Sequence, residues 1–138
     1  MRMPSDIVAF FDRYRDAFNS LDGSAVADLY AVPSGIAQSS EFTFWPARAP
    51  IQLNMAELCS AYRERGYAGA TYAAVHYFPQ GENYAVADLQ WRIDWTSGQE
   101  PWLFNTTYNL VRTEFGWRVL ICTAYAEDKL HIASRGEA

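Results

Sequence analysis

The sequence predicts an α+β fold in which helices from the first half of the chain cover one face of a sheet built from the second half. Apolar residues recur every three or four positions over residues 7–21 and again over 55–62, which is the period of a helix packed on one side. Over residues 70–125, apolar and polar residues alternate, as they do in strands with one buried face. A run of helices followed by a run of strands is typical of α+β folds.

The composition is that of an aromatic-rich, mildly acidic protein. The 138 residues include five Trp, nine Tyr and eight Phe, and the net charge is −5 with no run of Lys or Arg. A chain of this length can form a single domain, 1–138, with one core. The acidic balance argues against a nucleic-acid partner and against binding to an anionic membrane surface. No apolar run approaches the ~20 residues that cross a bilayer.

The chain ends and the cysteines bear on the cellular compartment. Residues 1–4 lead directly into a charged helix, so they are not expected to form a signal peptide. Cys59 and Cys122 lie on a predicted helix and a predicted strand far apart in the sequence. We therefore expect two reduced thiols in a cytoplasmic protein. The polar tail, 129–138, is expected to fray.

The first part of the chain predicts two helices. Ser5 can cap the first of them, and the apolar stripe that follows includes Tyr14. The second, shorter helix is expected over residues 24–30, with Tyr30 facing inward. Residues 32–35, which include a proline and a glycine, are expected to end it.

A short strand and a third helix are predicted next. Residues 36–50 are less regular and contain the strand 41–45, which ends in Trp45 before a proline. Asn54 followed by Glu57 has the form of a capping box, which predicts the start of the third helix.

Four antiparallel strands complete the predicted fold. Strands 70–78 and 84–95 are followed by a closing hairpin, 102–128, whose loop is 113–116. Because side chains alternate along a strand, residues that pair across the hairpin share a face. The expected pairs are Arg112 with Trp117, Leu110 with Val119, Tyr108 with Ile121, Thr106 with Thr123, and Phe104 with Tyr125.

A ligand pocket is expected between the helices and the sheet. A strongly curved sheet covered by three helices leaves a hollow, and ligand sites are usually concave and largely apolar. The candidate ligand-binding residues lie on stripes that should face this hollow: Tyr30, Trp45, Trp91, Thr106, Thr123 and Tyr125. Trp45 is the candidate for the rim. The alternative interpretation is that most of the aromatic rings are ordinary core.

The order of segments resembles a known superfamily. IVAFFDRYRDAFNSLDGSAVADLY, a short strand, a third helix and a final YNLVRTEFGWRVLICTAYAED resemble the nuclear transport factor 2-like superfamily, which includes SnoaL-like polyketide cyclases and ketosteroid isomerases. The resemblance covers nearly the whole chain and is most specific in the closing hairpin. It implies a cystatin-like, cone-shaped barrel with three N-terminal helices packed on a strongly curved, mainly antiparallel sheet. It also implies an apolar pocket and a homodimer formed through the outer face of the sheet.

The resemblance to ketosteroid isomerases can be followed residue by residue. Tyr14 falls where a tyrosine of that family donates a hydrogen bond to the substrate oxygen. Tyr108 falls near the second oxyanion donor, which is a protonated Asp in that family. The general-base Asp of the family would fall at residues 44–46, which are Phe-Trp-Pro here. Because no group at that place can accept a proton, steroid isomerisation by that mechanism is not expected.

Tyr14, Tyr108 and His76 are the candidate catalytic residues. The two phenols could polarise a carbonyl group, and His76 is the plausible base at neutral pH in the body of the chain. The alternative interpretation makes the tyrosines core residues whose hydroxyls bind neighbouring groups. The corresponding alternative for His76 is a hydrogen-bonded position on the sheet surface or at the dimer face.

One further motif lies on the second long strand. Arg92-Ile93-Asp94 resembles the Arg-x-Asp strand of limonene-type epoxide hydrolases in this superfamily, in which two acids and an Arg activate a water. Glu127 is the nearest candidate for the second acid. The alternative is an ion-paired strip with Asp88 and Gln90 on the outer face, because turning it inward would expose the apolar residues between these positions.

The sequence thus predicts a small-molecule site and does not identify the molecule. No Cys/His/Asp cluster has metal-ligand spacing and no Gly-rich phosphate loop is present, so no metal or cofactor is expected. We expect a small hydrophobic ligand or substrate, with cofactor-free acid–base chemistry of the isomerase, cyclase, dehydratase (lyase) or hydrolase type as the enzymatic form of this function. The alternative is a non-catalytic binding or dimerisation domain.

Overall fold

The computed structural model describes residues 2–125. The expected tail and the candidate acid Glu127 lie outside the described residues. Within them, three helices and six strands follow one another along the chain. Their bounds are α1 (Ser5–Asn19), α2 (Gly23–Ala27), β1 (Tyr30–Gln38), β2 (Glu41–Trp45), α3 (Arg48–Glu64), β3 (Tyr67–Gln80), β4 (Tyr84–Trp95), β5 (Trp102–Thr113) and β6 (Gly116–Tyr125).

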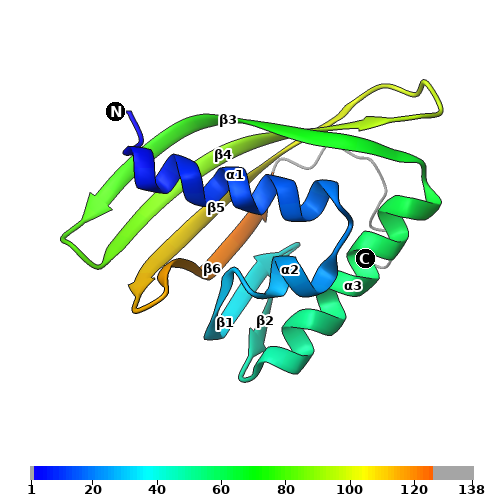
Figure 1. Ribbon diagram of the computed structural model, residues 1–138. Coiled ribbons are helices and arrows are strands. Elements are labelled where there is room, and N and C mark those ends of the chain that lie inside the picture. Colours follow the sequence, from blue (N-terminus) through cyan, green and yellow to red (C-terminus); the bar gives the residue numbers. More distant parts are fainter. Residues whose placement is uncertain (1, 126–138) are drawn as a thin grey trace.

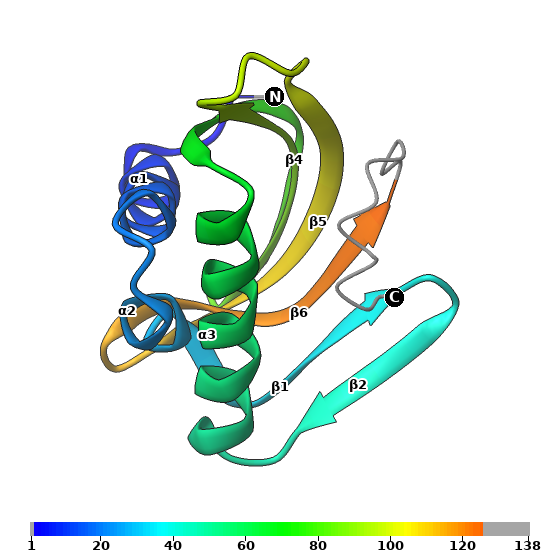
Figure 2. The same cartoon turned by 90° about the vertical axis from the view of Figure 1, so that its right-hand side faces the viewer.

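All six strands form one sheet in the order β2-β1-β6-β5-β4-β3. Every pairing is antiparallel except that of β1 with β6, which is parallel. In Figure 1, α1 lies across one face of β3–β6. Figure 2 shows the sheet curving around, with the β1–β2 hairpin projecting from one side and α3 standing in front of the concave side. The predicted cystatin-like α+β cone with a curved, mainly antiparallel sheet is confirmed.

The core lies between α1 and the concave face of the sheet. The helix stripe Ile7, Phe10, Phe11 and Tyr14 is buried, as its spacing predicts. The rings of Phe11 and Tyr108 are 5.0 Å apart between centroids, so α1 packs directly on β5. The predicted cap is wrong, because Pro4 occupies the N-cap position and no side chain caps α1.

A strand that the sequence did not predict follows α2. The second helix ends at Ala27, and Tyr30 begins β1. The pairing of β1 with β6 is interrupted between Tyr30 and Gly35, the segment that contains Pro33. Proline has no N–H to donate to a strand ladder. The sequence therefore signalled a loop where the chain forms an irregular strand.

The third helix begins seven residues earlier than its capping-box motif predicts. Its first residue is Arg48, and Asn54 lies inside the helix. Pro50 falls in the first turn, where backbone N–H groups have no partner within the helix, so the proline is tolerated there. The early start is supported by an ion pair of 2.5 Å between Arg48 and Asp28.

The closing hairpin has the expected register only near its loop. Leu110 pairs with Val119 as predicted, but the register shifts between Asn109 and Leu110. Beyond that β-bulge Tyr108 pairs with Cys122, not with Ile121. A bulge inserts one residue into one strand, and a shift of one residue turns every later side chain to the other face. Cys122 and Ala124 therefore face the helices, whereas the sequence predicted that Ile121, Thr123 and Tyr125 would do so.

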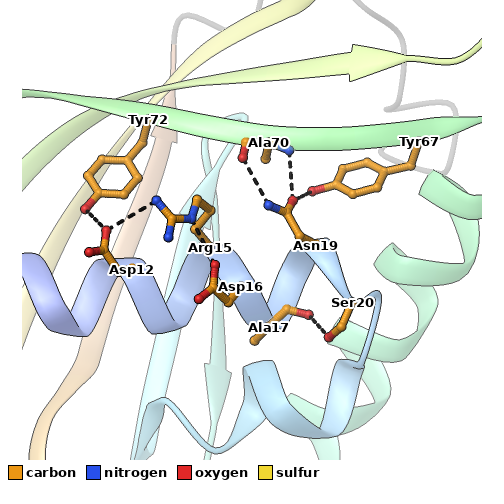
Figure 3. A network of polar contacts seen from close by, with 9 residues as sticks. All are labelled: Asp12, Arg15, Asp16, Ala17, Asn19, Ser20, Tyr67, Ala70 and Tyr72. Atoms are coloured by element: carbon orange, nitrogen blue, oxygen red, sulfur yellow. Dashed lines mark hydrogen bonds and ion pairs between the residues drawn. The ribbon is translucent and has the colours of Figure 1, made fainter.

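The end of α1 is tied to the start of β3 by Asn19 (Figure 3). Its carboxamide donates to the carbonyl of Ala70 at 3.2 Å and accepts from the N–H of the same residue at 2.8 Å. The Tyr67 hydroxyl also donates to the Asn19 side chain, at 2.6 Å. These bonds stand in for strand pairing where β3 shifts register between Tyr67 and Gly69. They fix both Tyr67 and Ala70, which line the cavity described below.

Candidate functional site

A cavity of about 570 Å³ lies between the helices and the concave face of the sheet. Its size is typical of sites for small organic molecules. Nine of the side chains that line it are aromatic: Tyr14, Phe18, Tyr30, Tyr62, Tyr67, Trp91, Trp102, Phe104 and Tyr108. Helices α1 and α3 and all six strands contribute to the wall. The cavity therefore exists only when the two halves of the chain pack together.

Buried phenols form a hydrogen-bonded chain on the inner wall. The hydroxyls of Tyr14 and Tyr30 are 2.7 Å apart, and the Tyr30 hydroxyl lies 3.5 Å from the Cys122 sulfur. Burial raises the pKa of Tyr14 and of Tyr30 well above the usual phenol value. Burial also raises the pKa of the Cys122 thiol to about 11. All three groups are therefore protonated at neutral pH and can donate hydrogen bonds.

Tyr108 is the phenol whose own proton is best placed for a ligand. The indole N–H of Trp91 donates to the Tyr108 oxygen at 3.0 Å, so this oxygen already acts as an acceptor. Burial raises the pKa of Tyr108 above its usual value, although hydrogen bonding with Tyr14, Trp91 and Thr106 opposes the rise. A neutral phenol can accept a hydrogen bond at its oxygen and at the same time donate its own O–H to another oxygen atom, such as one on a ligand.

The opening of the cavity is polar. Among the described residues that line it, only Ser39, Glu41 and Glu57 are exposed to solvent. Ser39 and Glu41 lie at the turn between β1 and β2, and Glu57 lies on α3, beside half-buried Asn54. The inner phenols, in contrast, are at most a few per cent exposed: Tyr14 and Tyr30 each 4% and Tyr108 3%. The site is thus apolar and phenolic inside and acidic at its mouth.

Five of the residues predicted from the sequence line this cavity. They are Tyr14, Tyr30, Trp91, Thr106 and Tyr108. Tyr30 reaches it from the first residue of β1, not from a helix. Trp45 was expected at the rim but is buried at 3% exposure, and its ring packs edge-on against Tyr30 at 5.7 Å. It supports a lining residue and is not itself part of the wall.

Two predicted ligand-binding residues lie on the wrong face. The bulge in β6 turns Thr123 and Tyr125 to the outer face, and neither lines the cavity. There the Tyr125 hydroxyl lies 2.7 Å from each carboxylate oxygen of Asp88, to which it donates. Thr107 donates to the same carboxylate at 3.2 Å. These three side chains form a polar cluster on the face away from the helices.

His76 does not lie in the cavity either. A register shift between Ala74 and His76 breaks the alternation assumed for β3. His76 is exposed and pairs across the strands with Asp88 on the outer face. The structure places it at the sheet surface, as the alternative interpretation had it, so the cavity has no imidazole among the described residues that line it.

The strip resembling an epoxide-hydrolase motif also lies outside. Arg92 and Asp94 form an ion pair of 3.0 Å with half-exposed side chains, and neither lines the cavity. They alternate along β4 with buried Leu89, Trp91 and Ile93. The outer-face interpretation is therefore confirmed, and water activation in the cavity by Arg92 and Asp94 is excluded by their position.

Several lining residues were not anticipated. Cys122 faces inward because of the bulge, which no local pattern marks. Tyr62 and Tyr67 are stacked with ring centroids 5.3 Å apart, and they meet because α3 runs directly into β3. The sequence analysis assigned Glu57 to a capping box and Glu41 to the start of a short strand, and gave neither a role in the site. Glu57 follows Asn54 by three residues, a spacing that places both on one helix face.

The described residues offer no evident site for a metal ion. No group of three or more His, Cys, Asp or Glu side chains is close enough there to hold one. Both cysteines are buried and free, as predicted. In residues 2–125, no helix combines the length and apolar character that a membrane crossing requires.

The fold and the cavity define a class of protein: an α+β cone that encloses an aromatic cavity beneath its helices. The chain belongs to the NTF2-like family, since the family model described as "NTF2-like protein (DUF6841)" matches residues 5–127. None of the curated proteins compared with the sequence matches it.

Solved structures share the fold at low sequence identity. A domain of unknown function with a cystatin-like fold from Nostoc punctiforme is 16% identical, with 91% of this chain and 78% of that one covered and a TM-score of 0.72. An NTF-2 like protein of unknown function from Shewanella oneidensis is 15% identical, with 88% and 98% covered and a TM-score of 0.71. A ketosteroid isomerase-like protein from Erwinia carotovora atroseptica is 15% identical, with 87% and 92% covered and a TM-score of 0.64. At these identities the likeness establishes the fold alone.

Proposed function

We propose that this protein binds a small hydrophobic molecule that carries a carbonyl or hydroxyl oxygen. The observation that carries this proposal is the Tyr108 hydroxyl, which lines an aromatic cavity of about 570 Å³ and already accepts the indole N–H of Trp91. The aromatic wall favours an apolar body, and the phenols provide donors for one oxygen atom. Tyr14 is the second donor in this proposal, and Tyr30, Trp91 and Thr106 complete the binding wall.

Binding without chemistry is the form that the cavity favours. The described residues of its inner wall include no carboxylate and no imidazole that could accept a proton, and general acid–base catalysis needs such a group within reach of the substrate. A SnoaL-like isomerase, cyclase or lyase reaction would therefore have Tyr14 or Tyr108 as the acid and would need Glu41 or Glu57 at the opening as the base. Turnover of a carbonyl ligand that disappears in Glu41→Gln or Glu57→Gln would establish this enzymatic alternative.

Replacing Tyr108 by phenylalanine is expected to weaken binding of 2-acetylnaphthalene by about threefold to tenfold, which is the value of one hydrogen bond. The variant keeps the ring and loses only the hydroxyl. Binding of 2-ethylnaphthalene, which has no oxygen, should not change. Titration monitored by tryptophan fluorescence measures both ligands on both proteins.

A matched control is Tyr84→Phe, because Tyr84 is 48% exposed and does not line the cavity. It should bind both ligands as the wild type does. Equal loss of both ligands in Tyr108→Phe would point to a distorted cavity and not to a missing donor. Unchanged binding of the ketone would remove Tyr108 from the site.

We propose in addition that the protein forms a homodimer through the outer face, defined as the side of β3–β6 turned away from α1. Phe78 and Leu103 are 61% and 46% exposed there, and exposed apolar side chains on one face favour association. Asp88 is already bound by Tyr125 and Thr107, so burying this face leaves its carboxylate with partners. Two-fold packing of the same face on both subunits gives a closed dimer.

Leu103→Glu is expected to convert the dimer to a monomer. In a two-fold dimer, the interface would have to bury the new carboxylate of each subunit without a partner of opposite charge. Sedimentation velocity at several protein concentrations measures the change. Leu53→Glu provides the control, since Leu53 is 61% exposed on α3 and away from the sheet. A wild-type protein that sediments as a monomer at every concentration would remove the dimer.

A further inference from the structure

We infer that the ligand carries a positively charged group, and that this group lies at the cavity opening between Glu41 and Glu57 while the ligand oxygen lies at the phenols. This inference rests on the proposed binding function and specifies its ligand: a hydrophobic amine with a carbonyl or hydroxyl group at the far end. It excludes fatty acids, other carboxylates and phosphate esters as preferred ligands.

The first support is the charge of the lining. Of the described residues that line the cavity, those charged at neutral pH are Glu41 and Glu57, and no Lys, Arg or His joins them. Neither carboxylate forms an ion pair with a described side chain. They come from different elements, β2 and α3. A cation placed at the opening would be attracted by both carboxylates, whereas an anion would be repelled by both.

The second support is the composition of the wall. Aromatic rings make up much of the cavity wall, including those of Tyr62, Tyr67 and Trp102. The faces of aromatic rings are electrically negative, so they attract cations and disfavour anions. The half-buried side chain of Asn54, near Glu57 on α3, can accept a hydrogen bond from an ammonium group.

A third, independent observation points to an acceptor on the ligand. The indole nitrogen of Trp102 is buried and has no hydrogen-bond partner among residues 2–125, and its side chain, which is 7% exposed, lies on the cavity wall. Buried donors are rarely left unpaired, and each such case needs an explanation. Ser34 and Trp95 also have unpartnered buried atoms, but neither lines the cavity. Trp102 is the one of the three whose side chain lines the cavity, and because its nitrogen atom is itself buried, a ligand oxygen would reach it only after the indole turns about its side-chain bonds.

Three probes that share one apolar body test the inference. They are 2-acetylnaphthalenes with a methyl, an aminomethyl or a carboxymethyl group at C6. The wild-type protein should bind the amine about threefold to tenfold more tightly than the methyl compound and the acid more weakly than either. High salt should reduce these differences, because the opening is exposed to solvent.

The decisive variant is Glu41→Gln/Glu57→Gln, in which both side chains are exposed and keep their size. The ratio of amine to methyl-compound affinity should fall toward one, while affinity for the methyl compound stays unchanged. Glu64→Gln, an exposed position of α3 that does not line the cavity, should leave the ratio as it is. Equal melting temperatures establish that the variants are folded.

The outcomes separate this inference from the function on which it rests. Equal binding of amine and acid, or an unchanged affinity ratio in the double variant, would overturn the charged-group inference and leave the hydrophobic site in place. Failure of all three probes to bind the wild-type protein would overturn both.

Discussion

Replacement of Phe11 by alanine is expected to lower the free energy of unfolding by about 3–5 kcal/mol. Phe11 is completely buried. Its ring lies 5.2 Å from that of Phe10, 6.1 Å from that of Tyr72 and 5.0 Å from that of Tyr108, measured between centroids. It thus joins α1 to β3 and to β5. Deleting the ring removes the favourable free energy of burying it and leaves a void. Helix α1 cannot move in to close this void, because its other contacts with the sheet hold it in place.

Urea denaturation followed by circular dichroism measures this loss. The control is Phe115→Ala in the hairpin loop, since Phe115 is 74% exposed and the same atoms are removed. That change should stay within about 0.5 kcal/mol of the wild type. A loss below about 1.5 kcal/mol for Phe11→Ala would show that the contact between helix and sheet is not the main source of stability.

Ligand affinity should also respond to this change, although Phe11 does not line the cavity. Its ring contacts Tyr14 and Tyr108, at centroid distances of 6.3 Å and 5.0 Å. Without it, the two phenols lose the support that sets their positions. A binding site held by packed neighbours is more precise than one left mobile. The core and the proposed site are therefore built from the same contacts.

Those parts of the fold that depend on local patterns could be predicted from the sequence. The stripe that contains Phe10 and Phe11 marks α1, and strict alternation marks β4, whose observed bounds match the expected 84–95. Both signals arise because one face of each element is buried against the other layer. The order of helices and strands then leads to an α+β fold and to a hollow between the layers.

The errors come from places where long-range contacts override the local signal. Pro33 and Gly35 suggest a loop, yet parallel pairing with β6 makes the segment a strand. The extra residue near Leu120 is invisible to alternation, and it reverses the facing of Thr123 and Tyr125. The break in β3 before His76 has the same effect. A bulge changes face without changing composition, so its position cannot be deduced from one strand by itself.

The candidate site shows the same division. Tyr14 and Tyr108 were identified because each lies on a stripe that faces the core, and the structure brings them to one cavity. The acidic opening was missed because Glu41 and Glu57 are exposed, and nothing in a linear pattern distinguishes an exposed glutamate at a cavity from one elsewhere. It becomes visible only when the turn after β1 and the helix α3 are placed in space.

Replacement of Gly23 by alanine is expected to destabilise the protein by about 3 kcal/mol. A methyl group at this position would lie 2.6 Å from the backbone nitrogen of Ala56 and 2.7 Å from its Cα. Backbone atoms inside a helix cannot rotate away as a side chain can, so α2 and α3 must separate. The higher helix propensity of alanine gains at most about 1 kcal/mol, which is less than the steric penalty.

The matched control is Gly98→Ala, where nothing lies within 4 Å and the only penalty comes from φ of +83°. That penalty is about 1–2 kcal/mol, so thermal and urea unfolding should separate steric repulsion at Gly23 from backbone strain.

The consequences for binding differ as well, because α3 carries Met55, Glu57 and Leu58 on the cavity wall. If α3 moves, Gly23→Ala should weaken binding of 2-acetylnaphthalene while Gly98→Ala leaves it unchanged. A stable Gly23→Ala protein with wild-type affinity would contradict the close packing of α2 on α3 that sets the position of this wall.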